Sequence, residues 1–163
     1  MKTEIEIYEE SFGVDKKFEA ELFKCQIETL KVNGKTVSEL FLLPCEIVKD
    51  GENYPANYVF AVATKKTERK KGYMEKLLKR VIADNKILIL RPINDSLIPY
   101  YQKFGFKIFT ATDKGNPNFF INPVNGFKAL ADFEGPSHSG EFTLMALNPP
   151  VDLSGVSFKF TLP

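Results

Sequence analysis

The segment formed by residues 58–78 constrains the fold more than any other part of this chain. An apolar run at 58–64 ends at a basic stretch, 65–71, and Gly72 then precedes residues with helical spacing. The N–H groups of a helix's first turn point outward, and the helix dipole favours negative charge there. A buried strand that turns through basic residues into such a helix predicts a site for an anionic group such as a phosphate.

Positive charge is concentrated in this part of the chain. The net charge of the 163 residues is only +1, yet eight of the 22 lysines and arginines lie within residues 65–80. A local cluster of this kind indicates an anionic ligand. The balanced charge of the whole chain argues against general adhesion to nucleic acid or to a membrane.

The first third of the sequence predicts two helices followed by a hairpin. Ile5, Tyr8 and Phe12 follow helical spacing, although residues 4–7 also alternate as in a strand. Asp15 is placed to cap a second helix. The dipeptide Asn33-Gly34, between two strand-like runs, is a strong signal for a two-residue hairpin.

The following turns extend this hairpin into a three-strand antiparallel meander and then a βαβ unit. Asp50-Gly51 marks the next turn, which leads to the strand at 58–64. An amphipathic helix follows Gly72, and a second apolar strand is predicted at 86–90. One crossover helix between two strands predicts that they are parallel neighbours.

The remainder completes a single domain over residues 1–163, of the α/β (α+β) class, with helices on both faces of a mixed sheet. We expect a C-terminal pair of strands at 142–147 and 156–162. Residues 111–140 are rich in glycine and proline and predict a long loop with short elements at 118–121 and 127–133. Loops of this length often cover functional sites.

The sequence predicts neither a disulfide nor a metal site. Cys25 and Cys45 form no C-x-x-C pair and are expected to be free thiols, while His138 is the only histidine. The N-terminus lacks the apolar core of a signal peptide, and no apolar run approaches the ~18 residues of a membrane span. The chain is therefore expected to be cytoplasmic.

A second motif follows the second parallel strand. Asn94 is placed to cap a helix that ends near Gly105, with Pro99 in its first turns and a further strand at 106–109. Its start coincides with the ends of two parallel strands, where open α/β sheets bind ligands. Tyr100 and Tyr101 point about 100° apart on a helix, so one can pack in the core while the other reaches this crevice.

Together the two motifs resemble those of the GNAT superfamily of acyl-CoA-dependent N-acetyltransferases. The family's cofactor motif, R/Q-x-x-G-x-G/A after a strand, matches residues 69–74, although Met74 replaces the usual small residue. Its second motif is an asparagine, a tyrosine seven positions later and Gly-Phe four positions after that. Asn94, Tyr101 and Gly105-Phe106 fit this register, and the resemblance covers residues 36–110.

The resemblance implies acetyl-CoA as co-substrate, without a metal. The strand would pair with the pantetheine arm through the backbone of Val62, Ala63 and Thr64, commonly beside a β-bulge. The turn would hold the diphosphate through Arg69, Lys70, Lys71, Gly72, Tyr73 and Met74. Asn94 would orient the arm, an N–H near Thr64 would polarise the thioester carbonyl, and Tyr101 would protonate the departing thiolate.

The resemblance further implies direct attack by a primary amine of a small molecule or a peptide, with no nucleic-acid or membrane partner, and it leaves a homodimer open. The acceptor itself is not identified, and neither is a general base. Glu28, Glu39 and Glu46 lie on meander strands, where a solvated face is expected, and His138 is expected to be an exposed loop residue. Four phenylalanines could line an acceptor pocket or, as we favour, anchor the long loop: Phe119, Phe120, Phe127 and Phe133.

Two other functions fit parts of the pattern. An acyl-CoA-binding module without catalysis would keep both motifs. A nucleic-acid binder would use the basic segment, but that segment lacks the interleaved aromatic residues on which bases stack. An N-acetyltransferase is therefore the leading prediction.

Overall fold

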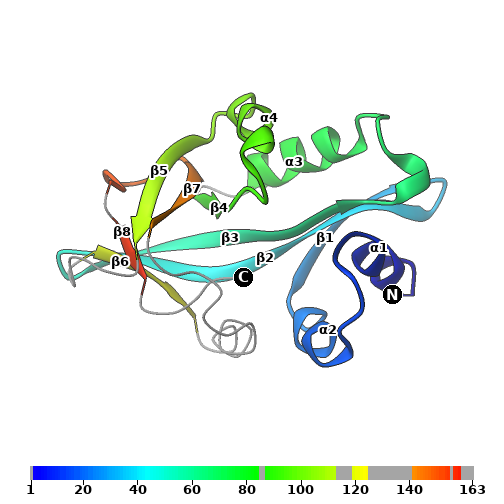
Figure 1. Ribbon diagram of the computed structural model, residues 1–163, viewed down its shortest axis with the longest axis horizontal. Helices are drawn as coiled ribbons and strands as arrows, with labels where there is room; N and C mark the ends of the chain where they lie inside the picture. The colour runs from blue at the N-terminus through cyan, green and yellow to red at the C-terminus, as the bar shows by residue number, and fades with distance from the viewer. Residues whose placement is uncertain (1, 85–86, 113–118, 125–140, 155, 159–163) are drawn as a thin grey trace.

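The computed structural model describes residues 2–84, 87–112, 119–124, 141–154 and 156–158. They form one mixed eight-stranded sheet in the order β1-β2-β3-β4-β7-β5-β8-β6, with helices on both faces (Figure 1). The predicted α/β fold is confirmed.

Helices α1 (Lys2–Phe12) and α2 (Lys16–Leu22) cover one face of the sheet (Figure 1). The helical alternative for the N-terminal residues is therefore correct. The predicted cap is present, because the Phe18 amide donates to Asp15 Oδ1 over 3.1 Å. Tyr8 and Phe18 are buried in an apolar cluster with Phe41 of the sheet.

Strands β1 (Gln26–Val32), β2 (Lys35–Lys49) and β3 (Glu52–Thr64) form the predicted antiparallel meander. Both turns place two consecutive residues at positive φ, 52° and 77° at Asn33-Gly34 and 51° and 82° at Asp50-Gly51. Two residues at positive φ are typical of the type I′ turns that match the twist of paired strands. Local sequence chemistry thus sets the register of the meander.

The predicted βαβ unit is also confirmed. Helix α3 (Tyr73–Asp84) leads from β3 to β4 (Leu88–Leu90), and the two strands pair in parallel over residues 57–59 of β3. The short 3₁₀ helix η2 (Asp95–Leu97) and helix α4 (Ile98–Gln102) follow on the same side of the sheet as α3 (Figure 1). A second apolar cluster fills the space between these helices and the sheet.

The last four strands are β5 (Lys107–Thr112), β6 (Phe119–Pro123), β7 (Glu141–Leu147) and β8 (Val156–Phe158). The two predicted C-terminal strands flank β5 rather than each other, because β7 lies between β4 and β5 while β8 lies between β5 and β6. Strand β6 occupies the short element expected at 118–121. The element expected at 127–133 and His138 lie outside the described residues.

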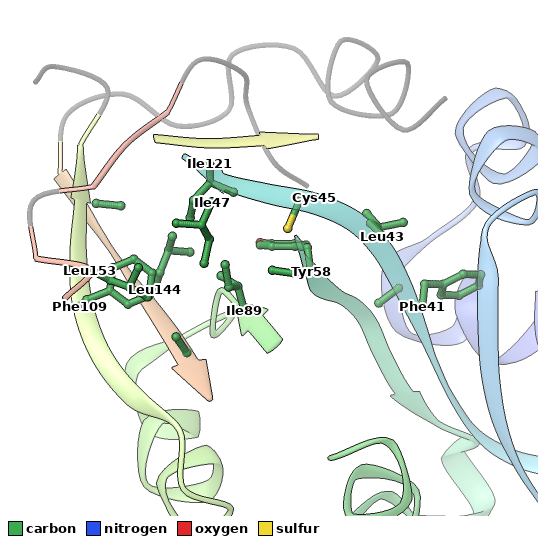
Figure 2. Close-up of a cluster of buried hydrophobic side chains, with 14 of the residues drawn as sticks. Phe41, Leu43, Cys45, Ile47, Tyr58, Ile89, Phe109, Ile121, Leu144 and Leu153 are labelled. Atoms are coloured by element: carbon green, nitrogen blue, oxygen red, sulfur yellow. The ribbon is translucent and has the colours of Figure 1, made fainter. Parts of the chain in front are cut away.

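Strand β6 closes the sheet on itself. It pairs with the second half of β2, from Cys45↔Pro123 to Lys49↔Phe119. Figure 2 shows the apolar interior of this closed end, where Ile47, Ile121 and Leu144 are buried. The other end of β2 and β3 lies outside this closed part of the sheet.

Both cysteines are free thiols, as predicted. Cys25 is partly buried and Cys45 is buried. Burial raises the pKa of Cys25 to about 11 and that of Cys45 to about 12, so both thiols are protonated at neutral pH. Among the described residues, no group of three or more histidine, cysteine, aspartate or glutamate side chains is placed to hold a metal ion. None of the described helices is both long and apolar enough to cross a membrane.

Candidate active site

Strand β3 carries a bulge where it leaves its parallel neighbour. Ala61 has a positive φ of 53°, and the register with β2 shifts between Glu39↔Ala63 and Phe41↔Phe60. Pairing with β4 ends at Val59↔Leu90. From Phe60 onward this edge of β3 therefore has no strand partner in the described part of the chain, so its peptide groups are open to an extended ligand.

The basic turn lies immediately beyond this open edge. The 3₁₀ helix η1 (Lys66–Glu68) is followed by Gly72, with a φ of 79°, and by the first residue of α3. The Lys76 amide donates to the Gly72 carbonyl over 3.2 Å, which starts the helical pattern. Amides nearer the start of α3 have no acceptor within the helix, so they can receive an anion.

The charged side chains of the turn also hold the turn itself together. Arg69 Nε donates to the Thr64 carbonyl over 3.1 Å, and its Nη2 donates to Ser11 Oγ over 3.2 Å. Lys71 Nζ pairs with Glu68 Oε2 at 2.8 Å. Arg69 and Lys71 thus brace the loop in addition to contributing positive charge, whereas Lys70 is exposed and has a φ of 65°.

Helix α1 contacts the basic turn. Glu10 Oε2 accepts a hydrogen bond from the Lys66 amide over 3.0 Å, next to the Ser11–Arg69 contact. Phe12, at the end of α1, reaches the gap between β3 and β4. The N-terminal helix is therefore fastened to the turn and forms one wall of the site.

Three adjoining cavities follow the open edge of β3 from the turn to α4. We call them the turn cavity (about 210 Å³), the middle cavity (about 460 Å³) and the inner cavity (about 240 Å³). The turn and middle cavities share Arg69, Lys70 and Tyr100, among others, and the middle and inner cavities share Val62 and Leu97. The inner cavity is lined by Phe12, Tyr58, Val59, Phe60, Ala61, Val62, Leu90, Arg91, Pro92, Ile93, Leu97 and Tyr101.

Tyr100 and Tyr101 both line cavities, and Tyr101 is the more deeply buried of the two. Tyr101 is buried, lines the inner cavity and packs edge-on against Tyr100, with ring centroids 5.4 Å apart. Tyr100 is half-buried and lines the other two cavities. Burial, with a smaller contribution from Tyr100, raises the pKa of Tyr101 to about 12. The Tyr101 hydroxyl is therefore protonated at neutral pH and has a proton to donate, although the raised pKa makes it a weaker acid than a free tyrosine.

The structure brings together nearly all of the residues predicted to bind the cofactor. Those that line the cavities are Val62, Ala63, Thr64, Arg69, Lys70, Gly72, Tyr73 and Met74. Lys71 lies in the same turn. Asn94 is exposed and caps η2, because its Oδ1 accepts from the Ser96 amide over 3.1 Å, and it lines none of the three cavities.

Reasoning from sequence missed three residues at or near the site. Phe12 and Arg91 line the inner cavity. Glu39 was expected on a solvated strand face, and this is wrong, because its side chain is 0% exposed and neither carboxylate oxygen has a hydrogen-bond partner in the structure. A signal was present for two of them: a charge directly after the buried strand β4 for Arg91, and a carboxylate inside the apolar run of β2 for Glu39.

Glu28 and Glu46 are partly buried, so only Glu39 departs fully from the expected solvated face. Burial, and to a smaller extent the negative charge of Glu4 on α1, raises the pKa of Glu39 to about 8. Glu39 pairs across the sheet with Ala63, two residues beyond the bulge. This raised pKa favours the protonated form of Glu39 at neutral pH, close to the open edge of β3.

The frame of this site is a mixed sheet whose bulged strand β3 opens onto a basic helix start. A family model described as an acetyltransferase (GNAT) domain matches residues 5–109. This chain belongs to the GNAT acetyltransferase family.

Several solved structures share the fold. A probable N-acyltransferase from Enterococcus faecalis is 17% identical with a TM-score of 0.58, over 69% of this chain and 32% of that one. A GNAT family acetyltransferase from Brucella melitensis, in complex with acetyl-CoA, is 15% identical with a TM-score of 0.52, over 76% and 86%. A GCN5-related N-acetyltransferase from Anabaena variabilis is 21% identical with a TM-score of 0.52, over 64% and 30%.

The chain thus spans about a third of the length of the first and third of these proteins and most of the length of the second. No curated protein matches the sequence.

Proposed function

We propose that this chain is an N-acetyltransferase that moves the acetyl group of acetyl-CoA to a primary amine. The observation that carries the proposal is the continuous line of three cavities from the Gly72 turn to Tyr101. Its outer end is basic and rich in helix-start amides, while its inner end is apolar and contains a protonated tyrosine. Acetyl-CoA has the matching order of groups, because its pantetheine arm runs from the diphosphate to the thioester.

In this proposal the chain's own residues bind and orient the cofactor. The amides at the start of α3 hold the diphosphate, and Lys70 and Arg69 add positive charge. The open peptide groups of β3 between Phe60 and Thr64 pair with the pantetheine arm. The bulge at Ala61 redirects an N–H toward the thioester carbonyl, where negative charge develops.

The transfer step balances without a metal or redox partner. The lone pair of the neutral amine attacks the thioester carbonyl carbon and forms a C–N bond, and the carbonyl π electrons move to oxygen. When the carbonyl re-forms, the C–S bond breaks and its electron pair leaves on sulfur. Tyr101 donates its hydroxyl proton to that thiolate, and the proton lost from the amine nitrogen restores the tyrosine through solvent.

Thiol release tests this function directly. Purified chain is incubated with acetyl-CoA and a panel of amines, including polyamines, aminoglycosides, amino acids and peptides, and free coenzyme A is measured. Acceptor-dependent release supports the enzyme. Coenzyme A binding without release for any amine would instead favour the non-catalytic binding module, which keeps the same cavities.

A substitution at Gly72 tests the turn separately from the chemistry. Gly72→Ala forces an L-residue to a φ of 79°, where no heavy atom lies within 4 Å of the added Cβ, so the cost is backbone strain of about 1–2 kcal/mol. If the turn relaxes to relieve this strain, coenzyme A affinity falls about tenfold by titration calorimetry.

Gly51→Ala is the matched control for this experiment. Gly51 has a φ of 82° in a hairpin and likewise no atom within 4 Å of an added Cβ. This variant should lose similar stability and keep its coenzyme A affinity. Equal affinities in the two variants would count against the turn as the diphosphate site.

A further inference from the structure

The inner cavity passes between the two faces of the sheet. Leu90 and Tyr101 belong to the apolar cluster beneath α3 and α4, on the side where the turn and middle cavities lie. Tyr58 belongs to the opposite cluster, which α1 and α2 cover, and Phe60 packs against that cluster. In the proposed function the cofactor occupies the side of α3 and α4, so the end of the inner cavity near α1 and α2 is left for the acceptor.

Four aromatic rings meet at this end of the cavity. Phe12 of α1 and Phe60 of β3 line the cavity directly. Tyr8 packs against Phe12 with ring centroids 5.1 Å apart, Phe18 packs edge-on against Phe60 at 6.0 Å, and the centroids of Tyr8 and Phe18 are 6.4 Å apart. Aromatic pairs at these separations attract each other beyond simple burial. We call these four residues the aromatic wall, which is formed before any ligand binds.

The aromatic wall is buried on one side and reaches solvent on the other. Tyr8 and Phe18 are buried in the core, whereas Phe12 is 37% exposed. Ile93, in the segment that follows β4, lines the same cavity and is 73% exposed. One exposed apolar side chain needs no explanation, but two large ones that line a single cavity favour an apolar ligand group there.

From this arrangement we propose that the acceptor is a primary amine with an apolar body about the size of an aromatic ring, and that Phe12 and Ile93 bind this body. This substrate class rests on the proposed acetyltransferase function. Contact with the aromatic wall removes the apolar body from water, which supplies binding free energy. Phe12 is thus a specificity-determining residue of the acceptor site.

The same contact assists the reaction in two ways. Phe12 and Tyr101 line one cavity, so an acceptor held by its apolar body keeps its amine near the thioester. An apolar environment also disfavours the ammonium form of the amine, which lowers the pKa of the amine and raises the share of the neutral form that attacks.

A short series of acceptors tests the inference. Phenethylamine is compared with ethylamine, which lacks the ring, and with methoxypropylamine, a more polar amine of similar length. Values of kcat/KM are expressed per neutral amine because the three amines differ in pKa. The wild-type chain should prefer phenethylamine over both by about 10- to 100-fold, the factor expected when a ring-sized apolar group leaves water.

Substitution of Phe12 should change this preference. Phe12→Ala should lower it about tenfold, mainly through KM, because most of the contact area for the ring is lost. Phe12→Leu keeps an apolar side chain and should retain part of the preference. Ile93→Ser should lower the preference by a smaller factor than Phe12→Ala does.

Controls separate this inference from a structural effect and from the proposed function. Ile108→Ala truncates an apolar side chain of β5 that is 48% exposed and lines none of the three cavities, so it should leave the preference unchanged. Coenzyme A affinity and melting temperature are measured for every variant. A second readout is the thermal shift produced by N-acetylphenethylamine, and by N-ethylacetamide, in the presence of coenzyme A.

The outcomes distinguish the inference from the proposed function. Equal use of phenethylamine and methoxypropylamine by the wild type, or an equal loss on both in Phe12→Ala, overturns the inference while acetyl transfer stands. If no amine reacts, the inference survives only when N-acetylphenethylamine shifts the melting temperature of the wild type more than N-ethylacetamide does, and less so in Phe12→Ala. Failure to bind coenzyme A overturns the proposed function, and the inference falls with it.

Discussion

Tyr101→Phe is expected to lower kcat by about 100-fold or more while leaving coenzyme A affinity unchanged. Loss of a positioned proton donor typically costs 10²- to 10⁴-fold. The substitution removes one hydroxyl from a buried ring that packs against Tyr100 and Phe106, with centroids 5.4 Å and 5.9 Å away, so the ring stays in place. Steady-state thiol release with a reactive acceptor, together with calorimetric titration of coenzyme A, measures both quantities.

The neighbouring tyrosine is the matched control. Tyr100→Phe removes a hydroxyl from the same helix, but Tyr100 lines the turn and middle cavities rather than the inner one. Its kcat should change less than about threefold, within the range of a lost peripheral contact. Full turnover by Tyr101→Phe would exclude this tyrosine as the proton donor.

The pH dependence of kcat is a second test of Tyr101 as the proton donor. The pKa of Tyr101 is raised to about 12, so the donor stays protonated throughout the neutral range. An alkaline decline in kcat with a midpoint near pH 7 would therefore come from another group.

The second large effect is expected in stability rather than in catalysis. The free energy of unfolding should fall as pH rises from about 4.5 to about 8, because of Glu39. Its pKa is raised from an ordinary value of 4.5 to about 8 by burial first and by Glu4 second. Within this window the folded chain holds a proton that the unfolded chain has released, so rising pH favours unfolding.

The size of this effect is set by the pKa difference. At about 1.4 kcal/mol for each pH unit, the interval from 4.5 to about 8 corresponds to roughly 5 kcal/mol. Water entering beneath a loosened α1 would reduce this value. Even half of it is a large fraction of the stability of an ordinary domain.

Glu39→Gln isolates the contribution. The amide has the same shape and does not titrate. The free energy of unfolding of this variant should therefore change little between pH 4.5 and 8, and it should exceed that of the wild type above pH 8. Glu46→Gln is the control on the same strand, where the carboxylate is partly exposed and accepts from Asn53 Nδ2 over 3.2 Å. Urea unfolding of the wild type and both variants from pH 4.5 to 9 measures how the free energy of unfolding depends on pH. The same pH dependence in the wild type and in Glu39→Gln would refute a raised pKa at this position.

Ionisation of Glu39 would also affect the candidate active site, through helix α1. Glu4 accepts a hydrogen bond from Thr36 Oγ1 over 2.9 Å at one end of α1, while Glu10 and Ser11 contact the basic turn at the other. Ionisation of Glu39 would place two negative charges together beneath this helix. Loss of α1 from the sheet would then also remove Phe12 from the inner cavity.

The parts of the fold that depend on local chemistry could be predicted from the sequence. Asn33-Gly34 and Gly72 require positive φ, and Asp15 caps α2 through its own side chain, so each signal lies within a few residues of its effect. The parallel pairing of β3 and β4 followed from a single crossover helix. Residues of both sequence motifs line adjoining cavities, because each motif is a continuous segment, although Asn94 lines none of them.

Features that depend on contacts distant in sequence could not be predicted. The closure of the sheet requires β6 to meet Cys45–Lys49 of β2, some 74 residues earlier, and no periodic pattern encodes that contact. The burial of Glu39 depends on α1 lying over β2. The meeting of Phe12 and Arg91 in one cavity likewise joins residues that are far apart in the sequence.

A crystal structure of the chain with coenzyme A would show whether the cofactor follows the three cavities. We expect the diphosphate over the amides that follow Gly72, the pantetheine arm along β3 from Phe60 to Thr64, and the thiol in the inner cavity beside Tyr101. Coenzyme A bound at another surface, or a chain that binds no coenzyme A at saturating concentration, would contradict it.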